Sequence, residues 1–195
     1  MPANPNIIQY GISNVHYAVR NDDGTYATPV HMPGGESMGM SNSGSSNFTV
    51  WADNGKYWDR AKSSGKEGDL QMAKFLASYY EDVLGFDVDE DGGIGENEDA
   101  TPKQFALMWQ LEGDKGGRRV VWYGCTSSIP TFTSATATDS MTEASETATI
   151  TASPVDVTET VNSTEVTVKR TQWSCEKGHP LYNTFFTAIP HATME

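Results

Sequence analysis

Apolar and polar residues alternate along much of the chain, and this period of two predicts a fold made mainly of β-strands. The first example spans residues 14–30, where Val15, Tyr17 and Val19 occupy alternate positions. The sequence NDDG, residues 21–24, follows, and its Asp–Gly pair can supply the positive φ that a tight turn needs. We therefore expect a β-hairpin over this segment.

A second, longer hairpin is expected over residues 33–66. Its first part, PGGESMGMSNSGSS at 33–46, is rich in Gly and Ser, and strand-like residues then surround a DNG turn. Such a polar hairpin has little to bury, so we expect it to be exposed and partly ordered. Trp51, Tyr57 and Trp58 lie in it, and exposed aromatic side chains are costly unless something covers them. We expect a partner subunit to cover them.

One short helix is expected at residues 79–84, after a strand near residues 68–75. Ser78 and Glu81 have the spacing of a capping box, in which the two side chains satisfy the free amides of a helix start. Gly85 is placed to end the helix.

The segment KQFALMWQLEGDKGGRRVVWYGC, residues 103–125, predicts two strands joined by a Gly-rich turn. Both strands carry apolar residues on both faces, which is typical of central strands and places Trp109 and Trp122 in a core or an interface. The residues expected to share a face are Phe105, Leu107, Trp109 and Leu111 on the first strand, and Val121, Tyr123 and Cys125 on the second.

Residues 126–168 are rich in Thr, Ser and Ala, so a flexible stalk competes with a strand interpretation. Alternation favours half-buried strands: Ala148, Ile150 and Ala152 interleave with threonines, and Val166 and Val168 follow the same pattern. Sequence patterns leave the role of the last segment, 157–195, open. Its stretch LYNTFFTAIP fits a helical turn or a strand equally.

Length and charge narrow the possible functions. With 195 residues, the chain is expected to form a single domain over 1–195. Its 26 acidic and 13 basic residues give a formal net charge of -13, which excludes a surface that grips phosphates by counterion release. The opening MPANPNIIQY lacks the pattern of a secretion signal, and no stretch is long enough to cross a bilayer. We therefore expect no membrane partner, and a protein that stays in the cytosol or leaves it without a standard secretion signal. Cys125 and Cys175 are expected to be two buried thiols.

The acidic loop at residues 87–99 contains a match to a metal-binding pattern. DVDEDGGIGENE, residues 87–98, fits the calcium-loop pattern D-x-[DN]-x-[DN]-G-x5-E. A calcium hand also needs an exiting helix, whereas Pro102 and the apolar run after it predict a strand. We interpret the loop as a solvated turn and keep calcium as the alternative. The candidate ligands for that alternative are Asp87, Asp89, Asp91, Gly93 and Glu98.

No enzymatic activity and no cofactor are predicted, because the chain lacks the G-x-S-x-G, H-E-x-x-H and Walker patterns. Arg118 and Arg119 form the only compact basic pair near the middle of the chain. The pair fits a solvated hairpin end, and it fits equally an ionic contact to an acidic neighbouring subunit.

Several blocks, in this order, make the chain similar to a known family: YGISNVHYAVRNDDGTYATPVHMPG, the Gly-rich hairpin, EDVLG, ENEDATPKQFALMWQLEGDKGGRRVVWYGC and ETATITASP. Together they resemble the major tail protein of long, non-contractile-tailed bacteriophages (siphophages), especially those of Gram-positive hosts. The likeness spans roughly residues 8–155 and includes no catalytic signature.

The resemblance implies a β-sandwich tail-tube fold with one short flanking helix and a long extended hairpin. It further implies hexameric rings that stack into the tail tube of the virion after assembly in the host cytoplasm. Tape measure, tail terminator and distal tail proteins would then be partners, and DNA would pass through the lumen without specific binding. The candidates for inter-subunit or ring-stacking contacts are Trp51, Tyr57, Trp58, Arg118 and Arg119. The alternative is a non-catalytic β-sandwich carbohydrate-binding module, with calcium supporting residues 87–98.

Overall fold

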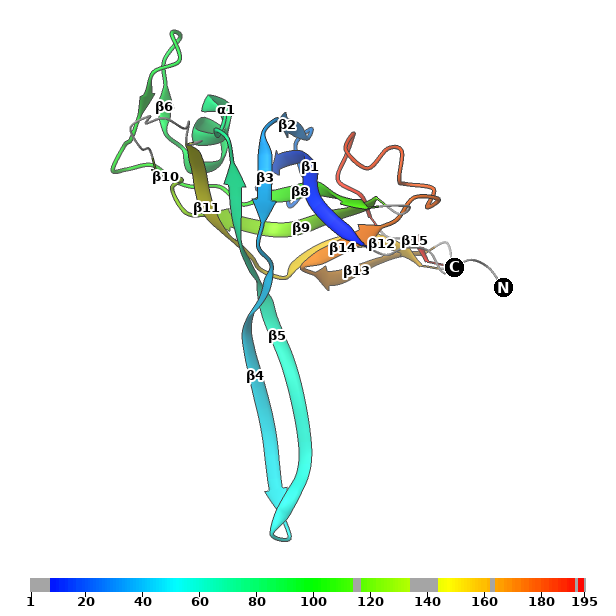
Figure 1. Ribbon diagram of the computed structural model, residues 1–195. Helices are drawn as coiled ribbons and strands as arrows, with labels where there is room; N and C mark the ends of the chain where they lie inside the picture. The colour runs from blue at the N-terminus through cyan, green and yellow to red at the C-terminus, as the bar shows by residue number, and fades with distance from the viewer. Residues whose placement is uncertain (1–7, 114–116, 134–143, 162–163, 192, 195) are drawn as a thin grey trace.

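The computed structural model is mainly β, with mostly antiparallel sheets and one short helix, as the sequence predicts (Figure 1). It describes residues 8–113, 117–133, 144–161, 164–191 and 193–194. The strands are β1 (Gln9–Val19), β2 (Val30–Met32), β3 (Gly35–Met38), β4 (Ser41–Ala52), β5 (Gly55–Met72), β6 (Asp87–Val88), β7 (Ile94–Gly95), β8 (Phe105–Gly113), β9 (Arg118–Ser127), β10 (Thr131–Thr133), β11 (Ser145–Ala152), β12 (Val155–Val161), β13 (Thr164–Arg170), β14 (Gln172–Cys175) and β15 (Thr193–Met194).

The largest sheet follows the strand order β2-β1-β8-β9-β11-β5-β3, and its last strand, β3, also contacts β1 near the other end of the order. The strand β3 returns beside β1, and a Cβ on Gly35 would lie only 2.6 Å from Val15 Cγ2. One apolar cluster fills the space that this sheet encloses. Its largest members are Tyr17 on β1, Met72 on β5, and Trp109 and Trp122 on the central strands.

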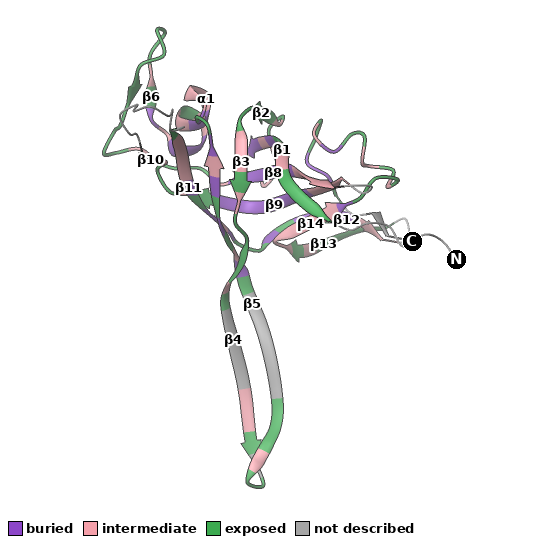
Figure 2. Ribbon diagram, viewed as in Figure 1, coloured by how far each residue is buried: buried purple, intermediate pink, exposed green. Residues whose placement is uncertain are grey.

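The central pair β8 and β9 is buried on both faces, which confirms the expectation from the apolar pattern (Figure 2). A second apolar cluster lies on the opposite face of these strands, where Val157 of β12 and the C-terminal residues Phe185 and Ile189 cover them. The strand β12 belongs to a smaller sheet of order β13-β12-β15. The two layers form the expected β-sandwich.

The β9 strand contains a bulge that corrects one part of the predicted pattern. Phe105 pairs with Cys125 and Leu107 with Trp122, so three residues of β9 advance against two of β8. Gly124 sits in the bulge with φ +54°. The extra residue turns Cys125 to the face of Trp122, away from Val121 and Tyr123, with which the sequence pattern had grouped it.

The short helix is confirmed, but its start and its type differ from expectation. It comprises α1 (Ala77–Tyr79) and a π-helical turn, η1 (Tyr80–Leu84), and its N-cap is Leu76 without a side-chain cap. The predicted capping box of Ser78 and Glu81 is therefore wrong, because Ser78 lies inside the helix. Gly85 ends the helix with φ 73°, as predicted. Buried Tyr79 and Leu84 join the first apolar cluster, so hydrophobic packing rather than a polar cap fixes the helix.

The Thr-rich region is built of strands where it is described, and residues 134–143 and 162–163 lie outside that description. Ala148, Ile150 and Ala152 are fully buried on β11, which confirms the alternation. The strand β13 is confirmed as a strand, but Val166 is 40% exposed, so this strand is not half-buried as expected. The stretch LYNTFFTAIP is neither a helix nor a strand but a series of turns closed by hydrogen bonds such as Thr187 N–H to Thr184 O.

Candidate assembly surfaces

The long hairpin predicted at residues 33–66 is confirmed for residues 41–66, which form an extended arm. Residues 35–38 instead form β3, which pairs with the body end of β5, and the separate strand predicted near residues 68–75 is the end of β5. We call residues 41–66 the arm: β4 pairs with β5 from Ser41–Glu67 to Ala52–Gly55, and the two strands project from the body (Figure 1). Only the end of β5, from Lys66 to Met72, is built into the body by pairing with β11. The arm beyond this point is a two-stranded ribbon, and such ribbons bury little surface of their own.

Three aromatic side chains gather at the tip of the arm. Asp53 and Asn54 both have positive φ, 51° and 63°, which closes the two-residue turn between the strands. Trp51 is 72% exposed, Tyr57 74% and Trp58 46%. The sequence therefore located all three exposed rings, and the structure shows that the turn brings them to the same end of the arm.

Where the arm leaves the body, glycines allow backbones to cross closely. A Cβ on Gly68 would lie 1.9 Å from the Gly39 carbonyl oxygen, and one on Gly65 would lie 2.5 Å from the Ala152 carbonyl oxygen. Any larger residue would push β5 away from its neighbours at these points. Sequence reasoning missed the role of these glycines, because only the Gly-rich composition was visible.

The predicted basic pair divides into two different environments at the start of β9. Arg118 forms an exposed ion pair with Glu176 of the same chain at 2.9 Å. Arg119 donates to Gln110 Oε1 and to the Tyr182 carbonyl oxygen, and its guanidinium lies 3.9 Å from the centre of the Tyr182 ring. Arg119 is therefore not the solvated hairpin end that one sequence interpretation expected, and its contacts lie within its own chain. It links the C-terminal segment to β8 and β9.

The acidic loop forms a small hairpin, β6 and β7, whose carboxylates do not converge. Asp89 Oδ1 accepts hydrogen bonds from the backbone amides of Asp91 and Gly93 at 3.0 and 2.7 Å, so this carboxylate closes its own turn. Asp87 accepts a bond from Asn97, and Glu98 is exposed. Among the described residues, no three His, Cys, Asp or Glu side chains are grouped as a metal site would require.

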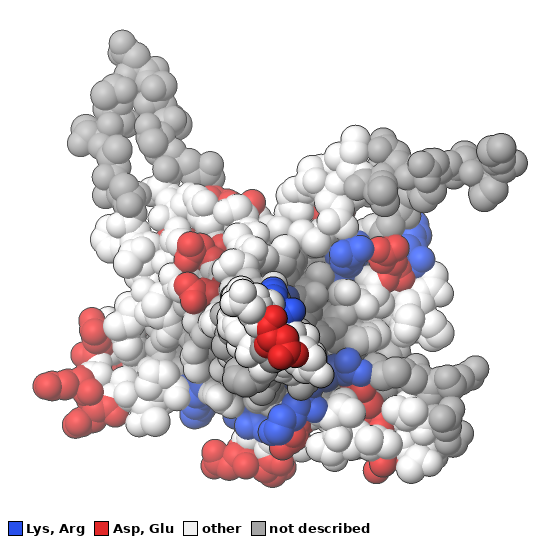
Figure 3. All heavy atoms as spheres, turned by 90° about the horizontal axis from the view of Figure 1, so that it is seen from below, with Lys and Arg blue, Asp and Glu red and all other residues white. Residues whose placement is uncertain are grey.

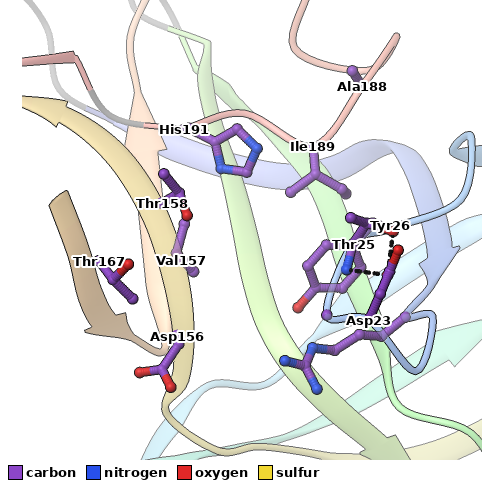
Figure 4. Close-up of a pocket in the computed structure, with 12 residues that line it drawn as sticks. Asp23, Thr25, Tyr26, Asp156, Val157, Thr158, Thr167, Ala188, Ile189 and His191 are labelled. Atoms are coloured by element: carbon purple, nitrogen blue, oxygen red, sulfur yellow. Dashed lines mark hydrogen bonds between the residues drawn. The ribbon is translucent and has the colours of Figure 1, made fainter. Parts of the chain in front are cut away.

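A pocket of about 600 Å³ opens between the turn after β1, the strand β12 and the C-terminal segment. Val157 and Thr158 form one side, Tyr26 and Asp23 face them, and Ile189 and His191 close the end (Figure 4). Arg20 also lines it, and its Nε is buried without a hydrogen-bond partner. Sequence reasoning did not find this pocket, since it joins three segments far apart in the chain.

Beside this pocket, a buried carboxylate lies near the C-terminal segment. Glu159 is 1% exposed and accepts two hydrogen bonds from Arg170, one of them from Nη2 at 2.7 Å. The bond to Glu159 is the main cause that raises the pKa of Arg170. Burial lowers the pKa of His191, and the charge of Glu159 opposes this effect. The neighbouring Tyr123 hydroxyl donates to the Pro190 carbonyl oxygen at 2.7 Å, which holds the segment in place.

Charge is distributed unevenly between the arm and the body. The arm has four basic and two acidic residues, a net charge of +2, whereas the rest of the chain has nine basic and 24 acidic residues, a net charge of -15. Figure 3, which views the molecule along the arm, shows Asp and Glu on the body around it, interspersed with Lys and Arg. The arm and the rest of the chain therefore carry net charges of opposite sign.

No protein-family model matches the chain, and no curated protein matches it either. Within the described residues, no helix is sufficiently long and apolar to span a membrane. The family resemblance thus depends on the sequence blocks of the chain itself.

Proposed function

We propose that the chain is a structural protein that assembles with copies of itself, as the major tail protein of a siphophage does. In this proposal six copies form a ring and rings stack into the tail tube of the virion. The observation that carries it is the arm, which extends away from the body and exposes Trp51 and Tyr57 at its tip. Aromatic rings exposed to water do not stabilise a monomer, whereas burying them between subunits would stabilise an assembly through the hydrophobic effect.

The sheet edges support the same proposal. The strand β13 is the outer strand of its sheet and pairs only with β12 among the described residues, and Val166 on it is exposed. Free strand edges can add a strand from another chain, and closed rings remove them. Strand pairing between copies would therefore suit both the ring and the protein's solubility.

The charge of the chain suits a channel for DNA. A net charge of -13 repels phosphates, so DNA would pass an acidic wall without being held by counterion release. The tape measure, tail terminator and distal tail proteins would be further partners, assembly would take place in the host cytoplasm, and no catalytic residue is needed for this role.

Electron microscopy of the purified full-length protein tests the proposal. Rings or tubes are the expected result, and their number should rise with protein concentration. Isolated particles of single-chain size at every concentration would contradict self-assembly.

A glycan pull-down addresses the carbohydrate-binding alternative, which rests on the same exposed Trp51 and Trp58 rings. Specific retention of such isolated particles on a glycan resin would favour that alternative.

A further inference from the structure

We infer that the pocket between the turn after β1, the strand β12 and the C-terminal segment receives the arm tip of a second copy of this chain. This inference rests on the proposed self-assembly and adds the acceptor site to it. The occupant is the tip sequence WADNGKYW, residues 51–58, with Trp51 and Tyr57 as the inserted rings.

The pocket has the chemistry that an aromatic tip requires. Tyr26, Val157 and Ile189 supply apolar surface, and a volume of about 600 Å³ can hold one or two aromatic side chains. The Arg20 guanidinium lines the same space, and a guanidinium attracts the face of an aromatic ring. Aromatic anchors in pockets of this kind contribute most of the binding energy at protein interfaces.

Charge at the rim favours the same occupant. Asp23 and Asp156 lie at the pocket, and Lys56 lies between the aromatic residues of the tip. Asp156 pairs with Lys169 at 3.2 Å, but its side chain remains 58% exposed and accessible to a second cation. The attraction between a net-positive arm and the acidic body would then act locally as well as at long range.

The arm cannot fill the pocket of its own chain, because it extends straight away from the body (Figure 1). A ribbon with strands as long as β4, 12 residues, reaches roughly 40 Å at the usual rise per residue. Arm and pocket are different surfaces, so each copy would offer one of each. Such a head-to-tail contact leaves an arm and a pocket free at the ends and propagates along one direction, as a stack of rings requires.

Disulfide trapping tests this inference on the full-length chain. Asp53→Cys places a thiol at the turn of the tip and leaves both inserted rings intact, and Ala188→Cys places a thiol at the exposed margin of the pocket. The native Cys125 and Cys175 are both free and buried, so they are protected from the added oxidant. After treatment with diamide, the double variant should give a ladder of disulfide-linked oligomers on a non-reducing gel.

The matched control combines Asp53→Cys with Glu90→Cys, a position on the exposed acidic hairpin where charge alone could attract the arm. This pair should give less than about a tenth of the linked product. An equal yield from both pairs would overturn the pocket as the acceptor. Tubes in the microscope without the link between positions 53 and 188 would also overturn the inference but leave the proposed function standing. Absence of any assembly would overturn both.

Discussion

At the scale of single residues, two features decide details that hydrophobic patterning could not. Gly124 adopts φ +54° in the bulge of β9 and thereby turns Cys125 into the main core. The period of two assumes an unbroken strand, so one extra residue reverses every later assignment. The glycine was visible in the sequence, but nothing in its neighbours distinguished a bulge from an ordinary strand position.

Replacing Gly124 by Ala should lower the free energy of unfolding by about 2–3 kcal/mol. The new Cβ would lie 2.5 Å from Val155 Cγ1 and 2.8 Å from the Ser153 carbonyl oxygen, in addition to the strain of positive φ. Urea unfolding measures the change. Gly92→Ala is the matched control, because Gly92 also has positive φ (+85°) but open space around it, and it should cost about 1 kcal/mol. Equal losses would contradict the steric explanation.

Two histidines whose pKa values are lowered in the folded chain predict that stability depends on pH. Burial lowers the pKa of His16 and of His191 below the ordinary value of 6.5. The unfolded chain then binds protons more readily, so the stabilisation is complete above pH 6.5 and is lost as the pH falls through the lowered folded-state pKa. Unfolding measured at pH 7.5 and at pH 5.5 should show lower stability at pH 5.5. The double variant His16→Gln, His191→Gln should reduce this difference, and an undiminished difference would show that other groups cause it.

At the scale of elements, the predictions succeeded where a pattern was long and local. The arm, the central strands β8 and β9 and the alternating strand β11 were each readable from their own residues. The helix was located, but its cap was predicted wrongly because Phe75, Tyr79 and Leu84 hold it by packing in the core, which local sequence does not reveal. The pocket and the position of Arg119 depend on the C-terminal turns, for which the sequence showed no period.

Mutations in the arm and mutations in the body should affect different properties of the protein. The double variant Trp51→Ala, Trp58→Ala should fold as stably as the wild type, since Trp51 and Trp58 lie on the arm and are largely or partly exposed. It should nevertheless form fewer or shorter tubes, because two of the three exposed aromatic side chains at the tip are removed. Thermal unfolding and tube length in micrographs provide the two readouts.

Leu70→Ala is the control, because Leu70 lies on the same strand β5 but is fully buried. Unlike the arm variant, it should lower the stability of the fold. It should cost about 2–5 kcal/mol of stability. Tube lengths unchanged in the arm variant would rule out the aromatic tip as a stacking contact.

The acidic hairpin should bind calcium only weakly. Asp89 already accepts two backbone amides, and the chain continues from the hairpin into β8 rather than into an exit helix. Calorimetric titration should show no affinity tighter than roughly millimolar, the range of weak extracellular modules. Micromolar binding that disappears in the Asp87→Ala variant would show that the carboxylates rearrange around the ion.

At the scale of the whole molecule, the shape of the chain and its charge lead to the same conclusion. The body of the sandwich buries two apolar clusters, and such a hydrophobic core is what a stable domain requires. The arm differs from the body, because it exposes aromatic side chains and carries a net positive charge on an otherwise acidic chain. Composition predicted the acidity, but only the structure shows that the arm and a pocket of matching chemistry belong to different parts of the molecule.

The mass of the protein in solution tests the central claim of self-assembly most directly. Light scattering over a wide range of concentration and salt should show particles that grow in multiples of the 21.3 kDa chain, with growth weakened by salt as the attraction between arm and body is screened. A constant mass of 21.3 kDa under all of these conditions would contradict it.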